Sequence, residues 1–152
     1  MSLAARFVFL FALAGTEIYA GKYNETKLRV AVPHQISERA SAVLAGRAPE
    51  FTPILMLTGL EVGEAEGLTF EVRAASARDS SESGPVLAVS GLEGRRQENP
   101  QDPVRKMDLP VPLNHKALEF LAGKKEVTFL LRLRNAGARP PLRVDHAGLL
   151  TQ

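Results

Sequence analysis

The sequence predicts an all-β protein, an antiparallel β-sandwich of about seven or eight strands with one or two short helices. The first observation behind this prediction is the alternation of apolar and polar residues in segments of strand length. It is most regular in Leu68–Ala74, where every second residue is apolar, and it recurs in Leu28–Val32, Met107–Leu113 and Val127–Leu133. The second is the spacing of turn residues, which suits a sandwich better than a βαβ fold.

Composition fits one globular domain, which we expect over residues 27–150 of the 152, since 45% of the chain is hydrophobic. The 19 basic and 17 acidic residues are interspersed, so the net charge of +2 creates no long-range field that would gather nucleic acid. We therefore expect no nucleic-acid partner.

The chain has no cysteine, which excludes disulfides, thiolate nucleophiles and cysteine-based metal sites.

Residues 1–20 allow two interpretations. Arg6 precedes the apolar run Phe7–Ala14, which has the length of a signal peptide's hydrophobic region and is too short to span a membrane. A cleaved signal would place the protein in the periplasm or outside the cell. The alternative is an extra N-terminal strand, because Phe7, Phe9 and Phe11 alternate with other apolar residues, as in a strand buried on both faces.

The predicted elements follow one another along the rest of the chain. In order, they are a strand over 27–32, a helix over 35–45, strands over 54–62, 68–74, 86–92 and 107–113, a helix over 115–122, and strands over 125–134 and 142–146.

In the N-terminal half, Pro33 ends the first strand, and apolar residues then recur at the helical period until Gly46 closes the helix. Residues 54–62 are apolar almost throughout, which is typical of a strand covered on both faces. The acidic turn at residues 63–67 is bounded by glycines. It predicts that strands 54–62 and 68–74 form a hairpin.

In the C-terminal half, Ser76–Gly84 is predicted to be an exposed loop, because its run Ser80–Gly84 is too polar to bury. Residues 94–106, with an arginine pair and two prolines, form the longest predicted connection. Asn114 is a suitable N-cap for the second helix, and Gly123 ends it. The turn residues at 135–141 separate the last two strands.

Few residues are candidates for chemistry. The histidines, His34, His115 and His146, are widely separated, so we predict no metal site. The carboxylates that could act as general acids or bases lie on a predicted turn or beside the short helix, where solvated charges are the ordinary case: Glu61, Glu64, Glu66, Glu119 and Glu126. The serines lack a nucleophile-elbow context: Ser80, Ser81, Ser83 and Ser90. We predict no catalytic, cofactor-binding or metal-binding residue, and no enzymatic activity.

Leu57–Val62 followed by Thr69–Val72 resembles a conserved stretch in the C-terminal domain of plant-type polyphenol oxidases and related bacterial tyrosinases. There, Gly-Ile/Leu-Glu-Val leads into Lys-Phe-Asp-Val. Flanking segments resemble the same domain in the same order: Leu28–Pro33, Gly84–Gly91, His115–Ala122 and Glu126–Leu130. The resemblance covers roughly residues 27–149, with Glu71 in place of the usual aspartate and Thr69 in place of the usual lysine.

The resemblance implies a β-sandwich that packs over the entrance of a type-3 copper oxidase domain and restrains substrate access, without contributing a copper ligand. The copper-binding histidine motifs of the family are absent from this chain, so the resemblance carries over no catalytic residue. The partner would be a type-3 copper oxidase domain, either upstream in a longer chain or on a separate chain. Surplus apolar residues at Phe7–Phe11, Leu130 and Leu149–Leu150 are expected to form the docking patch.

Two other hypotheses stay open. The first is a secreted or periplasmic binding module that recognises protein or carbohydrate through the loops at 75–84 and 93–106, because loops on a rigid scaffold commonly carry function. The second is an enzyme whose site is assembled from residues distant in the sequence.

Overall fold

The computed structural model describes residues 17–20, 25–62, 68–75, 83–92, 105–134 and 142–151. Within them the elements are β1 (Glu17–Ala20), β2 (Glu25–Ala31), α1 (His34–Leu44), β3 (Pro53–Val62), β4 (Leu68–Ala75), β5 (Ser83–Leu92), β6 (Arg105–Pro112), α2 (Lys116–Leu121), β7 (Glu126–Arg134) and β8 (His146–Thr151). One antiparallel sheet has the order β1-β2-β7-β4-β5 and the other β6-β3-β8. The predicted β-sandwich with two short helices is confirmed.

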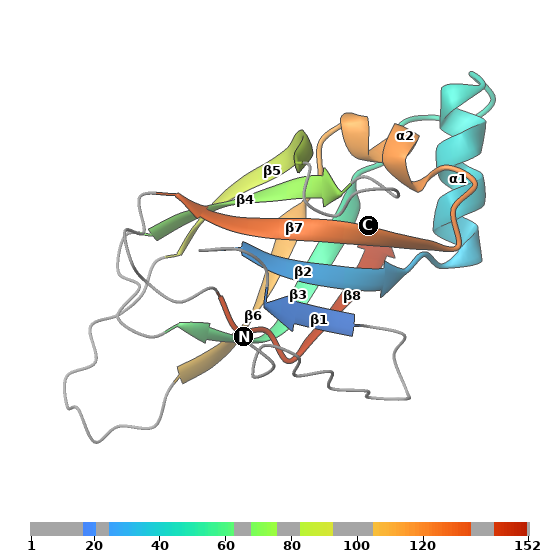
Figure 1. Cartoon of the computed structure of the whole chain (residues 1–152). Coiled ribbons are helices and arrows are strands. Elements are labelled where there is room, and N and C mark those ends of the chain that lie inside the picture. The colour runs from blue at the N-terminus through green and yellow to red at the C-terminus, as the bar shows by residue number, and fades with distance from the viewer. Residues whose placement is uncertain are drawn as a thin grey trace.

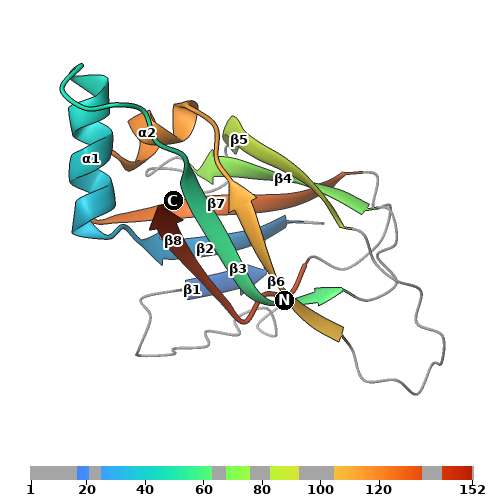
Figure 2. The same ribbon diagram turned by 180° about the vertical axis from the view of Figure 1, so that it is seen from behind.

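Figures 1 and 2 show the two sheets from opposite sides, with the three-stranded sheet behind the five-stranded one in Figure 1 and in front of it in Figure 2, and with both helices at the same end. The core lies between the sheets. It includes the faces that alternation predicts, with Leu28 and Val30 of β2, Phe70 and Val72 of β4, Val111 of β6, and Phe129 and Leu131 of β7. Leu55, Leu57 and Leu60 of β3 and Leu149 of β8 complete it. Each fully buried leucine or phenylalanine contributes about 1.5–3 kcal/mol relative to an exposed one.

The helices close the end of the core, and their boundaries follow the sequence signals. Ile36 and Ala40 are the buried apolar residues of α1, and Gly46 follows the helix with a φ of 72°. At the start of α2, the Asn114 side-chain oxygen accepts a hydrogen bond from the Lys116 backbone N–H at 3.0 Å, as an N-cap should. Gly123, with a φ of 68°, ends that helix as predicted.

The predicted hairpin between residues 54–62 and 68–74 is wrong. β3 pairs with β6 and β8, whereas β4 pairs with β5 and β7, so the connection at 63–67 carries the chain from one sheet to the other. The apolar faces of β3 and β4 are buried against each other's sheet across the core. The prediction that both faces of β3 are covered is only half right. The face toward the core is buried, but Met56 on the outer face is only partly buried.

The last strand begins later than predicted, at His146 instead of residue 142. Residues 142–145 cross from the five-stranded to the three-stranded sheet. Thr26 Oγ1 of β2 donates a hydrogen bond to the Leu142 carbonyl at 2.6 Å, and the Asp145 N–H donates to the Thr58 carbonyl of β3 at 3.0 Å. These hydrogen bonds, outside a regular ladder, attach the two ends of the crossing to the two sheets.

The end of the 1–20 segment belongs to the sheet. β1 pairs with β2 from Glu17 opposite Arg29 to Ala20 opposite Thr26. Residues 1–16, including Phe7–Phe11, lie outside the described residues. A signal cleaved after Ala20 would remove β1 from the sheet, whereas cleavage after Ala14 would leave it in place.

Gly59 permits the irregularity at the centre of β3. The β3–β6 register shifts between Leu57 and Leu60, and Gly59 has a φ of 67°, a conformation that L residues rarely adopt. Its N–H donates to Asp108 Oδ1 at 3.1 Å. A Cβ added there would lie 2.7 Å from the Cβ of Asp145 and 2.2 Å from its Oδ2, so the backbone itself would have to shift.

Gly59→Ala is expected to lower the free energy of unfolding by about 2–4 kcal/mol, because left-handed strain and a steric clash add together. Gly46→Ala is the matched control. Its φ is 72° but nothing lies within 4 Å of an added Cβ, so we expect a loss of about 1 kcal/mol. Urea denaturation followed by circular dichroism measures both. Equal losses would contradict the packing described around Gly59.

Candidate functional site

The outer side of the three-stranded sheet presents an apolar surface, here called the apolar face. It consists of Ile54 and Met56 of β3, Pro110 and Pro112 of β6, and Leu150 of β8. Ile54 stands opposite Pro112 and Leu150, and Met56 opposite Pro110, so cross-strand pairing places the five side chains together on the side away from the core. Leu150 is 48% exposed and both prolines are exposed, whereas Met56 is partly buried and Ile54 is buried beneath its neighbours at 9% exposure.

Charged side chains stand only at one end of this surface within the described residues. There, Lys106 Nζ and Asp145 Oδ2 form an ion pair at 3.0 Å. Pro110 and Pro112 lack a backbone N–H, so they weaken β6 as an edge to which another strand could add. The arrangement therefore favours a contact through side chains, as in a protein–protein interface whose centre is depleted of charge.

Of the docking patch expected from the sequence, Phe7–Phe11 lie outside the described residues, and only one of its three leucines is exposed. Leu149 is buried because alternation along β8 turns it into the core, and only Leu150 is exposed. Leu130 lies on the outer side of the five-stranded sheet but is fully buried. It stands between Lys27 and Arg73, whose long side chains flank it. Met56 and the two prolines were missed, although Met56 alternates with the core residues Leu55 and Leu57.

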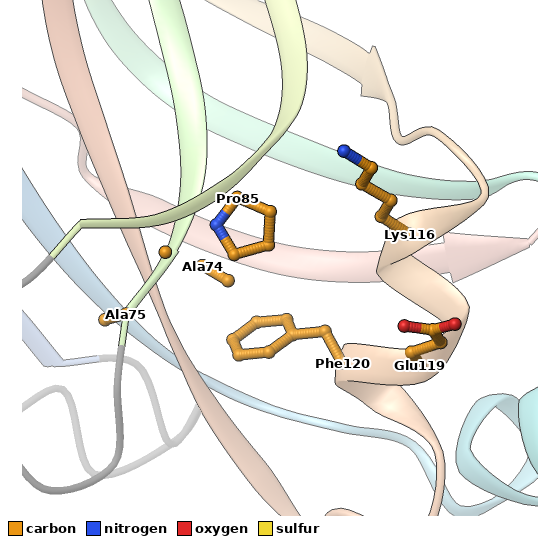
Figure 3. Close-up of a pocket in the computed structure, with 7 residues that line it drawn as sticks. Ala74, Ala75, Pro85, Lys116, Glu119 and Phe120 are labelled. Atoms are coloured by element: carbon orange, nitrogen blue, oxygen red, sulfur yellow. The ribbon is translucent and has the colours of Figure 1, made fainter.

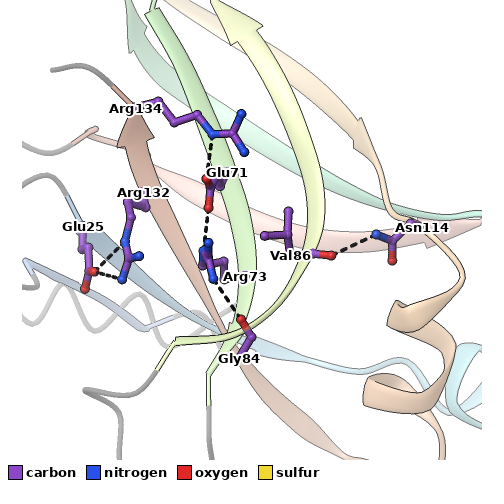
Figure 4. Close-up of polar contacts among 8 residues, drawn as sticks. All are labelled: Glu25, Glu71, Arg73, Gly84, Val86, Asn114, Arg132 and Arg134. Atoms are coloured by element: carbon purple, nitrogen blue, oxygen red, sulfur yellow. Dashed lines mark hydrogen bonds and ion pairs between the residues drawn. The ribbon is translucent and has the colours of Figure 1, made fainter.

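The outer side of the five-stranded sheet is ion-paired instead (Figure 4). The carboxylate of Glu71, a residue only 7% exposed, accepts hydrogen bonds from Arg73 Nε at 2.5 Å and Arg134 Nε at 2.6 Å. Arg73 also donates to the Gly84 carbonyl of β5 at 3.2 Å. Next to this group, Arg132 Nε donates to Glu25 Oε1 at 2.8 Å, which links β7 to β2.

These contacts change the titration of Glu71. Burial raises its pKa, but hydrogen bonds from Arg73 and Arg134 and their positive charges lower it by more. The net result is a pKa below the ordinary value for a glutamate. The two outer sides of the sandwich thus differ in kind, because one satisfies its charges internally and the other exposes apolar side chains.

The three histidines occupy separate places. His34 Nε2 lies 2.9 Å from Glu38 Oε1 at the exposed start of α1, a pair at i, i+4 that the sequence analysis overlooked. His115 Nδ1 lies 3.0 Å from Glu50 Oε1, and His146 begins β8. In the part of the chain that the structure describes, three or more metal-binding side chains do not gather anywhere.

The other candidates for chemistry are also dispersed. Glu126 of β7 pairs with Arg29, Glu119 is exposed on α2, and Glu61 is partly buried on β3. Ser90 is the eighth of the ten residues of β5, and Ser83 is the first. The remaining candidates lie outside the described residues: Glu64, Glu66, Ser80 and Ser81. So does most of the loops at 75–84 and 93–106.

A shallow depression lies where the end of β4, the start of β5 and α2 meet (Figure 3). It has a volume of about 620 Å³ and is lined by Ala74, Ala75, Gly84, Pro85, Lys116, Glu119 and Phe120. Phe120 and Pro85 point toward its centre, and Lys116 and Glu119 lie along α2 at its rim. Its floor is apolar, and the two charged groups sit at exposed positions.

Among the described helices, none is both long and apolar enough to cross a membrane.

The Glu71 contacts predict an acid-sensitive contribution to stability. Because the folded pKa lies below the unfolded one, the contribution is present above the ordinary glutamate pKa of about 4.3 and is lost as the pH falls through the folded pKa. In Glu71→Gln, the free energy of unfolding should fall less steeply than in the wild type between about pH 5 and pH 3. Urea denaturation across this range measures it, and parallel curves for Glu71→Gln and wild type would refute the assignment.

No family model matches the sequence, and no curated protein is significantly similar to it. The resemblance to the copper oxidases therefore stays a prediction from short segments that follow the same order along the sequence.

Proposed function

We propose that this chain is a non-catalytic β-sandwich that docks on a type-3 copper oxidase domain of the tyrosinase kind and shields the entrance to its active site. The observation that carries the proposal is the apolar face, a surface of neighbouring apolar side chains on one side of the sandwich only. The copper and the oxidation chemistry belong to the partner. The chain contributes bulk and a binding surface.

The contrast between the two sheets supports docking through one side. The five-stranded sheet pairs Glu25 with Arg132, and Glu71 with two arginines, so covering it would mean desolvating charges that are already satisfied. Covering the apolar face removes Met56, Leu150 and the prolines from water at a gain of about 25 cal/mol per Å². Association is therefore favoured at the three-stranded sheet.

The residues that resemble the oxidase domain are used here for packing. Gly59 makes the irregular turn of β3, Leu60 is fully buried beside it, and Phe70 and Val72 lie in the core from the opposite sheet. A resemblance carried by such positions concerns the fold. The dispersal of the histidines and carboxylates among the described residues favours a shielding domain rather than an enzyme.

Shielding acts by exclusion. A stable interface buries about 1,200–2,000 Å² in total, roughly 800 Å² from each partner, which is enough to cover the mouth of an active site. Phenolic substrates would then reach copper only in the fraction of oxidase domain that is free. Oxidation should therefore fall in proportion to occupancy, and release of the shield should restore it.

The test uses the copper-loaded oxidase domain encoded upstream in the same reading frame or beside it. Added as the full chain, the protein is expected to reduce the initial rate of diphenol oxidation in a saturable way. Leu150→Glu should raise the concentration needed for half-inhibition at least about tenfold, because it places a charge in the interface. Val89→Glu is the matched control. Val89 is 50% exposed, against 48% for Leu150, but lies on the other sheet, so inhibition should be unchanged.

Two results would contradict the proposal. One is a genome in which no type-3 copper domain is encoded in or near this reading frame. The other is an oxidation rate that stays constant in a large excess of the chain. Equal loss of inhibition in both variants would refute the assignment of the contact to the apolar face.

A further inference from the structure

β5 forms an unguarded edge of the five-stranded sheet. Among the described strands it pairs only with β4, and none of its ten residues, Ser83–Leu92, is charged. Edge strands expose backbone N–H and C=O groups that attract another strand, and natural proteins usually protect them with charge or proline. β6 has such protection in Lys106, Asp108 and its prolines, and β1 is only four residues long.

The first half of β5 is already covered. The Asn114 backbone N–H donates to the Leu87 carbonyl at 2.8 Å, and its side-chain amide donates to the Val86 carbonyl at 2.9 Å. Pro85 has no N–H to offer. Within the described residues, no further strand or hydrogen bond covers Ala88–Leu92 on this side, so this stretch is open to another strand.

This open stretch has side chains that suit an antiparallel copy of itself. In a pair with a two-fold axis at Ser90, Val89 of one chain stands opposite Gly91 of the other. Val89 is half exposed, and nothing lies within 4 Å of the position that a Cβ on Gly91 would occupy. The empty space beside Gly91 can thus receive the Val89 side chain of a second chain.

Charge does not oppose this pairing. On the outer side, the charged residue opposite the open stretch is Glu71 of β4, which faces Val89. It is paired with Arg73, which reaches the Gly84 carbonyl of β5, and with Arg134, so this group carries one net positive charge. In the pair, the two Glu71 residues would be separated by three strand spacings, about 14 Å, which exceeds the Debye length of about 8 Å at physiological ionic strength.

We propose that two copies of this chain associate through Ala88–Leu92 of β5, antiparallel about Ser90, and join their five-stranded sheets into one continuous sheet. The occupant is a strand because the groups that need partners are backbone groups, and it is a second copy because the stretch is neutral and self-complementary. A stable interface buries at least about 1,200 Å², and a strand pair of five residues buries less. We therefore expect weak association, with a dissociation constant on the order of 0.1–1 mM. This pairing does not involve the apolar face.

Sedimentation velocity on the full chain between about 0.01 and 2 mM should show a monomer–dimer equilibrium. Val89→Lys and Gly91→Lys should each weaken it at least about tenfold, because each introduces a charge at the two-fold contact. Gly91→Lys is expected to fold normally, since its site is open. Leu150→Lys is the control of equal exposure and should dimerise as the wild type does.

Amide hydrogen exchange provides a readout at the strand itself. Protection of residues 88–92 should rise with concentration in the wild type and stay constant in Gly91→Lys. A chain that remains monomeric up to about 2 mM would overturn the proposal. A dimer that persists in both lysine variants, or a dimer that Leu150→Lys abolishes, would also overturn the proposal. In either case, a strand from another protein would be the partner to test at this edge.

Discussion

The structure depends on the burial of two apolar sheet faces against each other. β3 supplies Leu55, Leu57 and Leu60 to this core, and β4 and β7 supply the side that faces them. Since side chains alternate along a strand, turning these residues inward also decides which residues point outward. Both outer surfaces of the molecule are therefore consequences of the core.

The two outer surfaces take different forms. On the five-stranded sheet, the outward residues are glutamates and arginines that neutralise one another across β2, β7 and β4. On the three-stranded sheet, the outward residues of an almost wholly apolar β3 meet prolines on β6 and Leu150 on β8. A sandwich with one satisfied side and one apolar side is suited to lie against another protein in a single orientation. This is the physical basis for the proposed shielding role.

Local patterns predicted most of the fold. Alternation identified the strands, helical period and caps placed both helices, and Asn114 and Gly123 act at the positions expected of them. The hairpin of β3 and β4 was wrong because glycines around an acidic turn show where the chain reverses, not whether it stays in the same sheet. The late start of β8 has a related cause, since residues 142–145 alternate like a strand while crossing between sheets.

The candidate docking surface was harder to predict. Leu130 has the sequence character of a surplus apolar residue, yet its cross-strand neighbours Lys27 and Arg73 enclose it. Met56, Pro110 and Leu150 come together only through the register of three strands that are far apart in the sequence. No local sequence pattern specifies which distant strands pair. The surface could therefore be identified only from the structure.

Native-state hydrogen exchange tests the shared core most directly. If the two sheets are held together by one apolar interior, the central strands β3 and β7 should open with the same free energy, equal to that of global unfolding. Opening of β3 at a much lower free energy than β7 would show that the three-stranded sheet is not bound to the rest by a common core, and would contradict this account.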